Sequence, residues 1–178
     1  MTLLNVQFAI NKEVNNIKKF LFMNNQYINI YNNLINLTRN KELYKNFKKQ
    51  DIFSDRLIFF MLHFAFFLKN FKKNEKKNIM QDIYDYVFRQ LELSIREIGY
   101  GDQSINKKMK IYINTFYAML DKIHNWEKLS LSDKKSVLLC FLDNNLDENY
   151  LVNYFDNYAN DLVNNTLNSY TKGVIKQL

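Results

Sequence analysis

The sequence predicts an all-α protein, a single compact domain of six to eight helices with no sheet. Apolar residues recur three and four positions apart along nearly the whole chain, which is the spacing of one helix face. The 178 residues include no proline and only three glycines. Those are too few turn formers for a many-stranded sandwich or a loop-rich α/β enzyme. The length suits one domain, and 47% hydrophobic residues argue against disorder.

Two helices are expected before residue 40. The first has its apolar stripe at Leu3, Val6, Ile10, Val14, Ile17 and Leu21. A break at Asn24–Asn25 then separates residues 1–24, an N-terminal helix at the periphery, from residues 25–178, the main helical domain. The second helix carries Tyr27, Tyr31, Leu34 and Thr38, and a short segment around Leu43 and Tyr44 follows.

The next helix, about residues 55–71, is apolar on nearly every face and should be surrounded by neighbours. Ser54 can cap its start, since a serine hydroxyl accepts from an unpaired amide of the first turn. Its apolar run, 57–68, has 12 residues. A membrane-spanning helix needs about 20, so a buried core helix in a soluble protein is expected.

Four further helices follow. A helix over about 75–98 has its core stripe at Met80, Tyr84, Val87, Leu91, Ile95 and Ile98, and Gly99 stands where a left-handed C-cap is expected. Ser104 is a good N-cap for the next helix, whose stripe is Ile105, Met109, Tyr112, Phe116, Met119 and Ile123. Ser132 with Asp133 starts another, and the last carries Leu151, Phe155, Tyr158 and Leu162.

Charge is unevenly distributed along the chain. The net charge is +7, yet residues 143–171 hold five acids and no Lys or Arg, so the remainder carries +12. A basic surface favours phosphates of RNA or anionic lipid headgroups. No nucleic-acid motif accompanies the lysines, so specific binding to DNA is not expected.

Metal, cofactor and nucleophile chemistry is not expected. Of the two histidines, neither His63 nor His124 has a partner one helical turn away, whereas zinc needs roughly three or four ligands. Cys140 stands among leucines and Phe141, which predicts a core thiol. The glycine turn at 99–102 follows a helix rather than a strand. A helix–helix turn capped by Asp102 is therefore favoured, with anion binding at the next helix start as the alternative.

Residues 95–117, IREIGYGDQSINKKMKIYINTFY, resemble the ubiquinol–cytochrome c chaperone family. The matching positions are Arg96, Glu97, Gly99, Gly101, Asp102, Lys107, Lys108, Met109, Lys110, Phe116 and Tyr117. A second block matches at the family's spacing, with Asp51, Arg56, Leu62 and His63. Gln50, Asp55 and the pair Ala118–Met119 depart from the family pattern.

The resemblance implies a non-enzymatic assembly factor without a cofactor. Such a protein holds nascent or newly inserted cytochrome b during assembly of the respiratory cytochrome bc complex, complex III. The implied partners also include the ribosome surface near the exit tunnel and peripheral contact with a membrane. The alternative is a basic helical module associated with the ribosome or RNA. The N-terminus lacks the pattern of a secretory or transit peptide, which predicts the bacterial cytoplasm at the inner face of the membrane, with mitochondria as the alternative.

A polar cluster is the most specific structural hypothesis. Arg56 lies on a mostly buried helix, where a guanidinium requires a carboxylate partner. We expect Asp51, Arg56, His63, Glu97 and Asp102 to converge. Together with the other matching positions, Arg96, Gly99, Gly101, Lys107, Lys108, Phe116 and Tyr117, they organise the fold or form the client-binding face.

Overall fold

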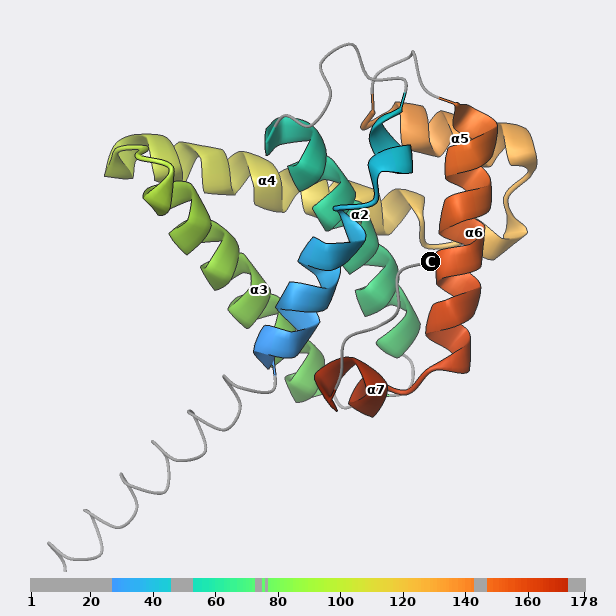
Figure 1. Ribbon diagram of the computed structural model, residues 1–178, viewed down its shortest axis with the longest axis horizontal. Helices are drawn as coiled ribbons and strands as arrows, with labels where there is room; N and C mark the ends of the chain where they lie inside the picture. The colour runs from blue at the N-terminus through green and yellow to red at the C-terminus, as the bar shows by residue number, and fades with distance from the viewer. Residues whose placement is uncertain (1–26, 46–52, 73–74, 76, 143–146, 173–178) are drawn as a thin grey trace, which may run out of the picture.

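The structure, a computed structural model, describes residues 27–45, 53–72, 75, 77–142 and 147–172, and within these ranges every regular element is a helix (Figure 1). The prediction of an all-α fold is confirmed. The elements are a helix over residues 27–37, the 3₁₀ helix η1 (Lys41–Tyr44), α2 (Phe53–Phe71), α3 (Lys77–Glu97), α4 (Asp102–Lys122), the 3₁₀ helix η2 (Trp126–Lys128), α5 (Leu131–Leu139), α6 (Glu148–Asn164) and α7 (Leu167–Lys172). The helix expected over residues 1–24 lies outside the described residues.

Helix α2 is the centre of the fold. Every residue from 59 to 68 is buried, because α4 and α6 pack against it and the helix of residues 27–37 crosses it (Figure 1). This confirms the expectation of a surrounded apolar helix. The helix begins at Phe53, two residues earlier than expected, so Ser54 lies inside the first turn and its predicted capping role is wrong. None of the described helices combines the length and the apolar character needed to cross a membrane.

Helix α6 packs on the other side of α2 through aromatic rings. The ring of Phe66 stacks on Phe155, with centroids 5.2 Å apart, and meets Trp126 edge-on at the same distance. The indole nitrogen of Trp126 donates to Asp156, 2.7 Å away, and the ammonium of Lys134 donates to both oxygens of the same carboxylate. One carboxylate therefore joins η2, α5 and α6.

The helix of residues 27–37 connects α3 to α7. The hydroxyl of Tyr31 lies 3.1 Å from that of Ser94 on α3. On its other side, the amides of Asn29 and Asn33 donate to the carbonyls of Thr171 and Tyr170. The last carbonyls of a helix have no N–H of a following turn as a partner. In the short α7 these two asparagine side chains supply the missing donors.

Helices α3 and α4 form a hairpin whose turn, residues 98–101, projects from the body (Figure 1). Their core stripes are as expected at Val87, Ile95 and Met119, which are buried. Two details differ. The second helix begins at Asp102, with Gly101 as its N-cap, so Ser104 is not the cap. Ile98 is 54% exposed, because the chain has already left α3 for the turn.

Candidate functional site

Arg96 joins the two arms of the hairpin at its turn. Its Nε and Nη2 donate to one oxygen of Glu92 on α3, at 3.1 and 2.7 Å, and its Nη1 donates to Asp102 at the start of α4. The hydrogen bonds that Arg96 donates to Glu92 and, as the second contribution, to Asp102 raise the pKa of its guanidinium. The acid at Asp102 also lies in the first turn of a helix, where a negative charge is favoured. Ion pairs of Arg96 therefore join the end of α3 to the start of α4 across the turn.

The two glycines of the turn have different roles. Gly99 has φ +98°, in the left-handed region that favours glycine, and its N–H donates to the carbonyl of Arg96 at 2.9 Å. The predicted left-handed C-cap is confirmed. Gly101 is extended, with φ −70° and ψ 154°, and serves as the N-cap of α4 without a side chain to cap it. Only Gly99 is required by its backbone conformation.

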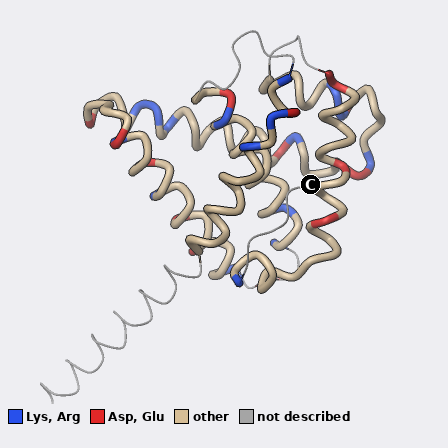
Figure 2. Tube along the Cα trace, viewed as in Figure 1, with Lys and Arg blue, Asp and Glu red and all other residues tan. Residues whose placement is uncertain are grey.

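The outer surface of the hairpin turn combines apolar side chains with lysines. Ile98, Tyr100 and Ile111 are 54%, 41% and 51% exposed. The ammonium of Lys108 lies 4.4 Å from the centre of the Tyr100 ring. Figure 2 shows basic positions along the first half of α4 and acidic positions at the turn itself. We call residues 96–111 the hairpin tip.

Phe116 and Tyr117, neighbours in the sequence, lie in different environments. Phe116 is fully buried, and its ring stacks on that of Phe64 in α2 at 5.2 Å. Tyr117 is 54% exposed, with its ring 6.0 Å from that of Tyr84 on α3. Phe116 therefore holds the hairpin against the body, and Tyr117 is available at its surface.

His63 lies in the core and not in a polar cluster. Its Nδ1 is 2.6 Å from the carbonyl of Phe59 and its Nε2 is 2.8 Å from the hydroxyl of Tyr154 on α6. Both ring nitrogens are used, so neither is left for a carboxylate. Burial lowers the pKa of His63 to about 4, against a smaller rise from the bond to Phe59. His63 is therefore neutral at pH 7, and its expected place beside Glu97 and Asp102 is wrong.

The remaining members of the expected cluster are Asp51, Arg56, Glu97 and Asp102. Asp51 lies outside the described residues, and Arg56 is exposed near the start of α2. Glu97 is exposed at the end of α3. Burial raises the pKa of Tyr31, and the charge of Glu97 adds a smaller rise. The charged pair that the hairpin brings together from the predicted set is Arg96 with Asp102, and Glu92 completes it. The core position predicted for Cys140 is wrong as well, because the residue is the exposed C-cap of α5.

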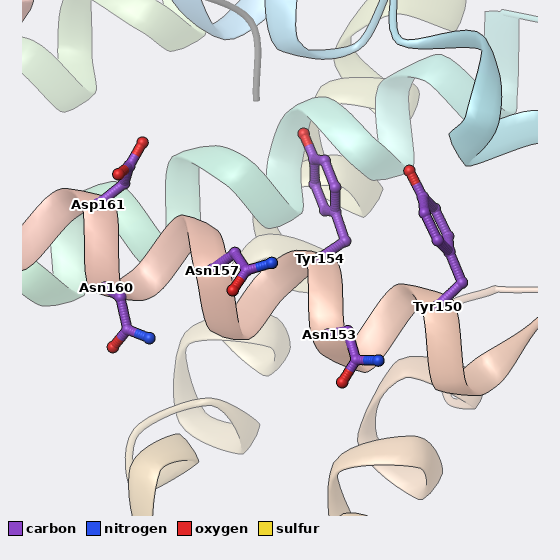
Figure 3. Close-up of a pocket in the computed structure, with 6 residues that line it drawn as sticks. All are labelled: Tyr150, Asn153, Tyr154, Asn157, Asn160 and Asp161. Atoms are coloured by element: carbon purple, nitrogen blue, oxygen red, sulfur yellow. The ribbon is translucent and has the colours of Figure 1, made fainter.

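A groove along α6, which was not predicted, encloses about 640 Å³ (Figure 3). It is lined by Tyr150, Asn153, Tyr154, Asn157, Asn160 and Asp161. The Tyr150 side chain is hydrogen bonded to Asn40 before η1, and Tyr154 holds His63, so two tyrosines of the groove are already engaged. The signal in the sequence is the spacing of the three asparagines, four and three residues apart, on the exposed face of an otherwise buried helix.

The described residues contain no group of three or more His, Cys, Asp or Glu side chains placed to hold a metal ion.

One comparison with known proteins gives a match. The family model described as ubiquinol-cytochrome C chaperone matches residues 45–149, more than half of the chain. The matched range contains α2, the whole α3–α4 hairpin and α5, and it ends at the start of α6. No curated protein and no solved structure shows a significant match to the chain.

Proposed function

Because the chain belongs to the ubiquinol–cytochrome c chaperone family, we propose that it assists assembly of complex III by binding newly made cytochrome b. The observation that carries the proposal is the family match over residues 45–149. The role we propose is non-enzymatic and needs no bound cofactor. We place it at the inner face of a bacterial cytoplasmic membrane, with mitochondria as the alternative.

The client contact that we propose lies on the side of the α3–α4 hairpin. Exposed apolar side chains on neighbouring helices mark sites for protein partners. Tyr117 is 54% exposed beside Tyr84 of α3, and Leu93 is 44% exposed elsewhere on α3. A client that consists of apolar helices supplies side chains able to cover them. The Arg96–Asp102 pair supports this surface by tying the two arms together at the turn.

Deletion of the gene tests the proposed function. We expect less cytochrome b and lower complex III activity in the deletion strain, both restored by the wild-type gene. Succinate dehydrogenase activity, which does not depend on cytochrome b of complex III, is the matched control. Normal cytochrome b and normal complex III activity in the deletion strain would contradict the proposal.

A second candidate function is contact with the ribosome or another RNA, which the net charge of +7 favours. Cosedimentation of the purified protein with ribosomes tests it. Binding that falls steeply with salt, in a strain whose cytochrome b does not depend on the gene, would select this function over the first. Binding to ribosomes together with loss of cytochrome b would instead make the ribosome the place where the client is met.

A further inference from the structure

We propose that the hairpin tip is a docking site for a membrane surface with anionic headgroups. Ile98, Tyr100 and Ile111 enter the headgroup region, and Lys107, Lys108 and Lys110 contact the lipid phosphates. This interaction goes beyond the binding of a protein client and does not require that the client be cytochrome b.

The position of the hairpin tip in the fold suits a flat surface. The α3–α4 turn is the outermost part of the arm that the hairpin forms (Figure 1). Ile98 and Tyr100 stand in the turn itself, and both are exposed although they are apolar or aromatic. A tyrosine has an apolar ring and a polar end, which is the combination favoured at a membrane interface.

Two lysines of the tip lie next to its apolar side chains. Lys107 and Lys108 precede Ile111 by four and three residues, which places all three on one side of α4. The ammonium of Lys108 in turn covers one face of the Tyr100 ring, 4.4 Å from its centre. A basic side chain next to an inserted apolar one is the pattern of proteins that lie on anionic lipid.

The acids of the turn do not neutralise these lysines. Asp102 and Glu92 are both bonded to Arg96. Glu97 makes no ion pair with a lysine of the tip within the described residues. Within the described ranges, neither Lys107 nor Lys110 forms an ion pair. Their charge is therefore available to a partner.

A lipid surface explains the tip better than RNA does. RNA phosphates would attract the lysines, but they offer nothing to Ile98 or Ile111. Bases stack on open aromatic faces, whereas one face of Tyr100 is already covered by Lys108. Only an interface that is both apolar and anionic uses all six side chains.

Cosedimentation of the full chain with vesicles tests the proposal. We expect binding to vesicles of phosphatidylcholine and phosphatidylglycerol in equal parts and little binding to phosphatidylcholine alone. The variant K107Q/K108Q/K110Q should bind the mixed vesicles at least tenfold more weakly, because each lysine near an anionic surface strengthens binding about fivefold. The variant I98S/I111S should bind the mixed vesicles about tenfold more weakly, because two apolar side chains no longer insert into the headgroup region.

Matched variants away from the tip are the controls. K41Q/K72Q/K128Q removes the same charge from exposed lysines elsewhere, and L131S/V163S removes two exposed apolar side chains of α5 and α6. Both should bind the mixed vesicles like the wild type. Thermal unfolding followed by circular dichroism verifies that all four variants fold.

Three results would overturn the proposal: no preference of the wild type for anionic vesicles, unchanged binding by the tip variants, or equal losses in the controls. The same proteins are also measured with a single-stranded RNA. RNA binding that depends on the tip lysines, without vesicle binding, would assign the surface to RNA. Because these measurements use the purified chain, normal cytochrome b in a deletion strain would refute the proposed function and leave this inference standing.

Discussion

The imidazole of His63 and the hydroxyl of Tyr154 lie 2.8 Å apart in the core and join α2 to α6. The Nδ1 of His63 faces the Phe59 carbonyl, which can only accept, so Nδ1 carries the proton. Nε2 of the neutral ring then accepts from Tyr154. Protonation of His63 would make both nitrogens donors and would place a charge in the core, which burial disfavours.

Stability should therefore fall in mild acid. Burial lowers the pKa of His63 to about 4 in the folded protein, against an ordinary value of 6.5 for a solvated histidine. Above pH 6.5 the histidine is neutral in both states and its contribution is fully present. Between pH 6.5 and 4 only the unfolded chain takes up the proton, so the free energy of unfolding falls by up to about 3 kcal/mol over this range. Urea unfolding at a series of pH values measures the loss.

The double variant H63F/Y154F should remove this pH dependence, and it should be more stable at pH 7 than H63F, which leaves the Tyr154 hydroxyl buried without its partner. H124Q, at the exposed second histidine, is the control and should keep the wild-type slope. The same slope in the double variant would show that His63 is not the group responsible.

Asp156 should be the most sensitive acid of the described residues. Replacing it with alanine leaves the buried indole N–H of Trp126 and the ammonium of Lys134 without their shared acceptor. We expect D156A to lose about 2 kcal/mol of unfolding free energy. D121A, at an exposed acid on α4, should change stability by less than about 0.5 kcal/mol. Equal effects in the two variants would refute the assigned role.

The two turn glycines should respond in opposite directions to serine. G99S forces a side chain into the left-handed region and should cost about 1 kcal/mol, although there is open space for a Cβ. G101S supplies the missing hydroxyl at the N-cap of α4 and should stabilise by about 0.5 kcal/mol. Chemical denaturation of both variants measures the difference, and a stable G99S would contradict the assigned conformation.

Variants at Phe116 and at Tyr117 should affect different properties, the first stability and the second function. F116A creates a cavity beside Phe64 and should cost about 3–5 kcal/mol. Y117A should lower stability far less, because the side chain is half exposed. If the hairpin side binds the client, Y117A should nevertheless fail to restore cytochrome b in the deletion strain. Full restoration by Y117A would remove Tyr117 from the client surface.

Local features of the fold were predictable wherever one short stretch of chain decides them. The core stripe of α6 at Leu151, Phe155 and Leu162 is buried as its spacing predicts. The left-handed Gly99 was predictable because it follows the last periodic residue of a helix. The start of α4 was not predictable, because several residues near Gly101 could cap it. The bond between Arg96 and Asp102 favours the start at Asp102 over the later start after Ser104.

By itself, the sequence determined that this protein is helical, that α2 is its centre, and that it carries the family's Arg-Glu-x-Gly-x-Gly-Asp segment. Only the tertiary structure decided what each matching residue does. His63 is a core residue because Tyr154, 91 positions away, supplies its partner. Phe116 is inside and Tyr117 outside because α2 covers one side of α4. Helical periodicity is a local property, whereas a side chain's protonation, exposure and partners depend on whichever distant helix packs against it.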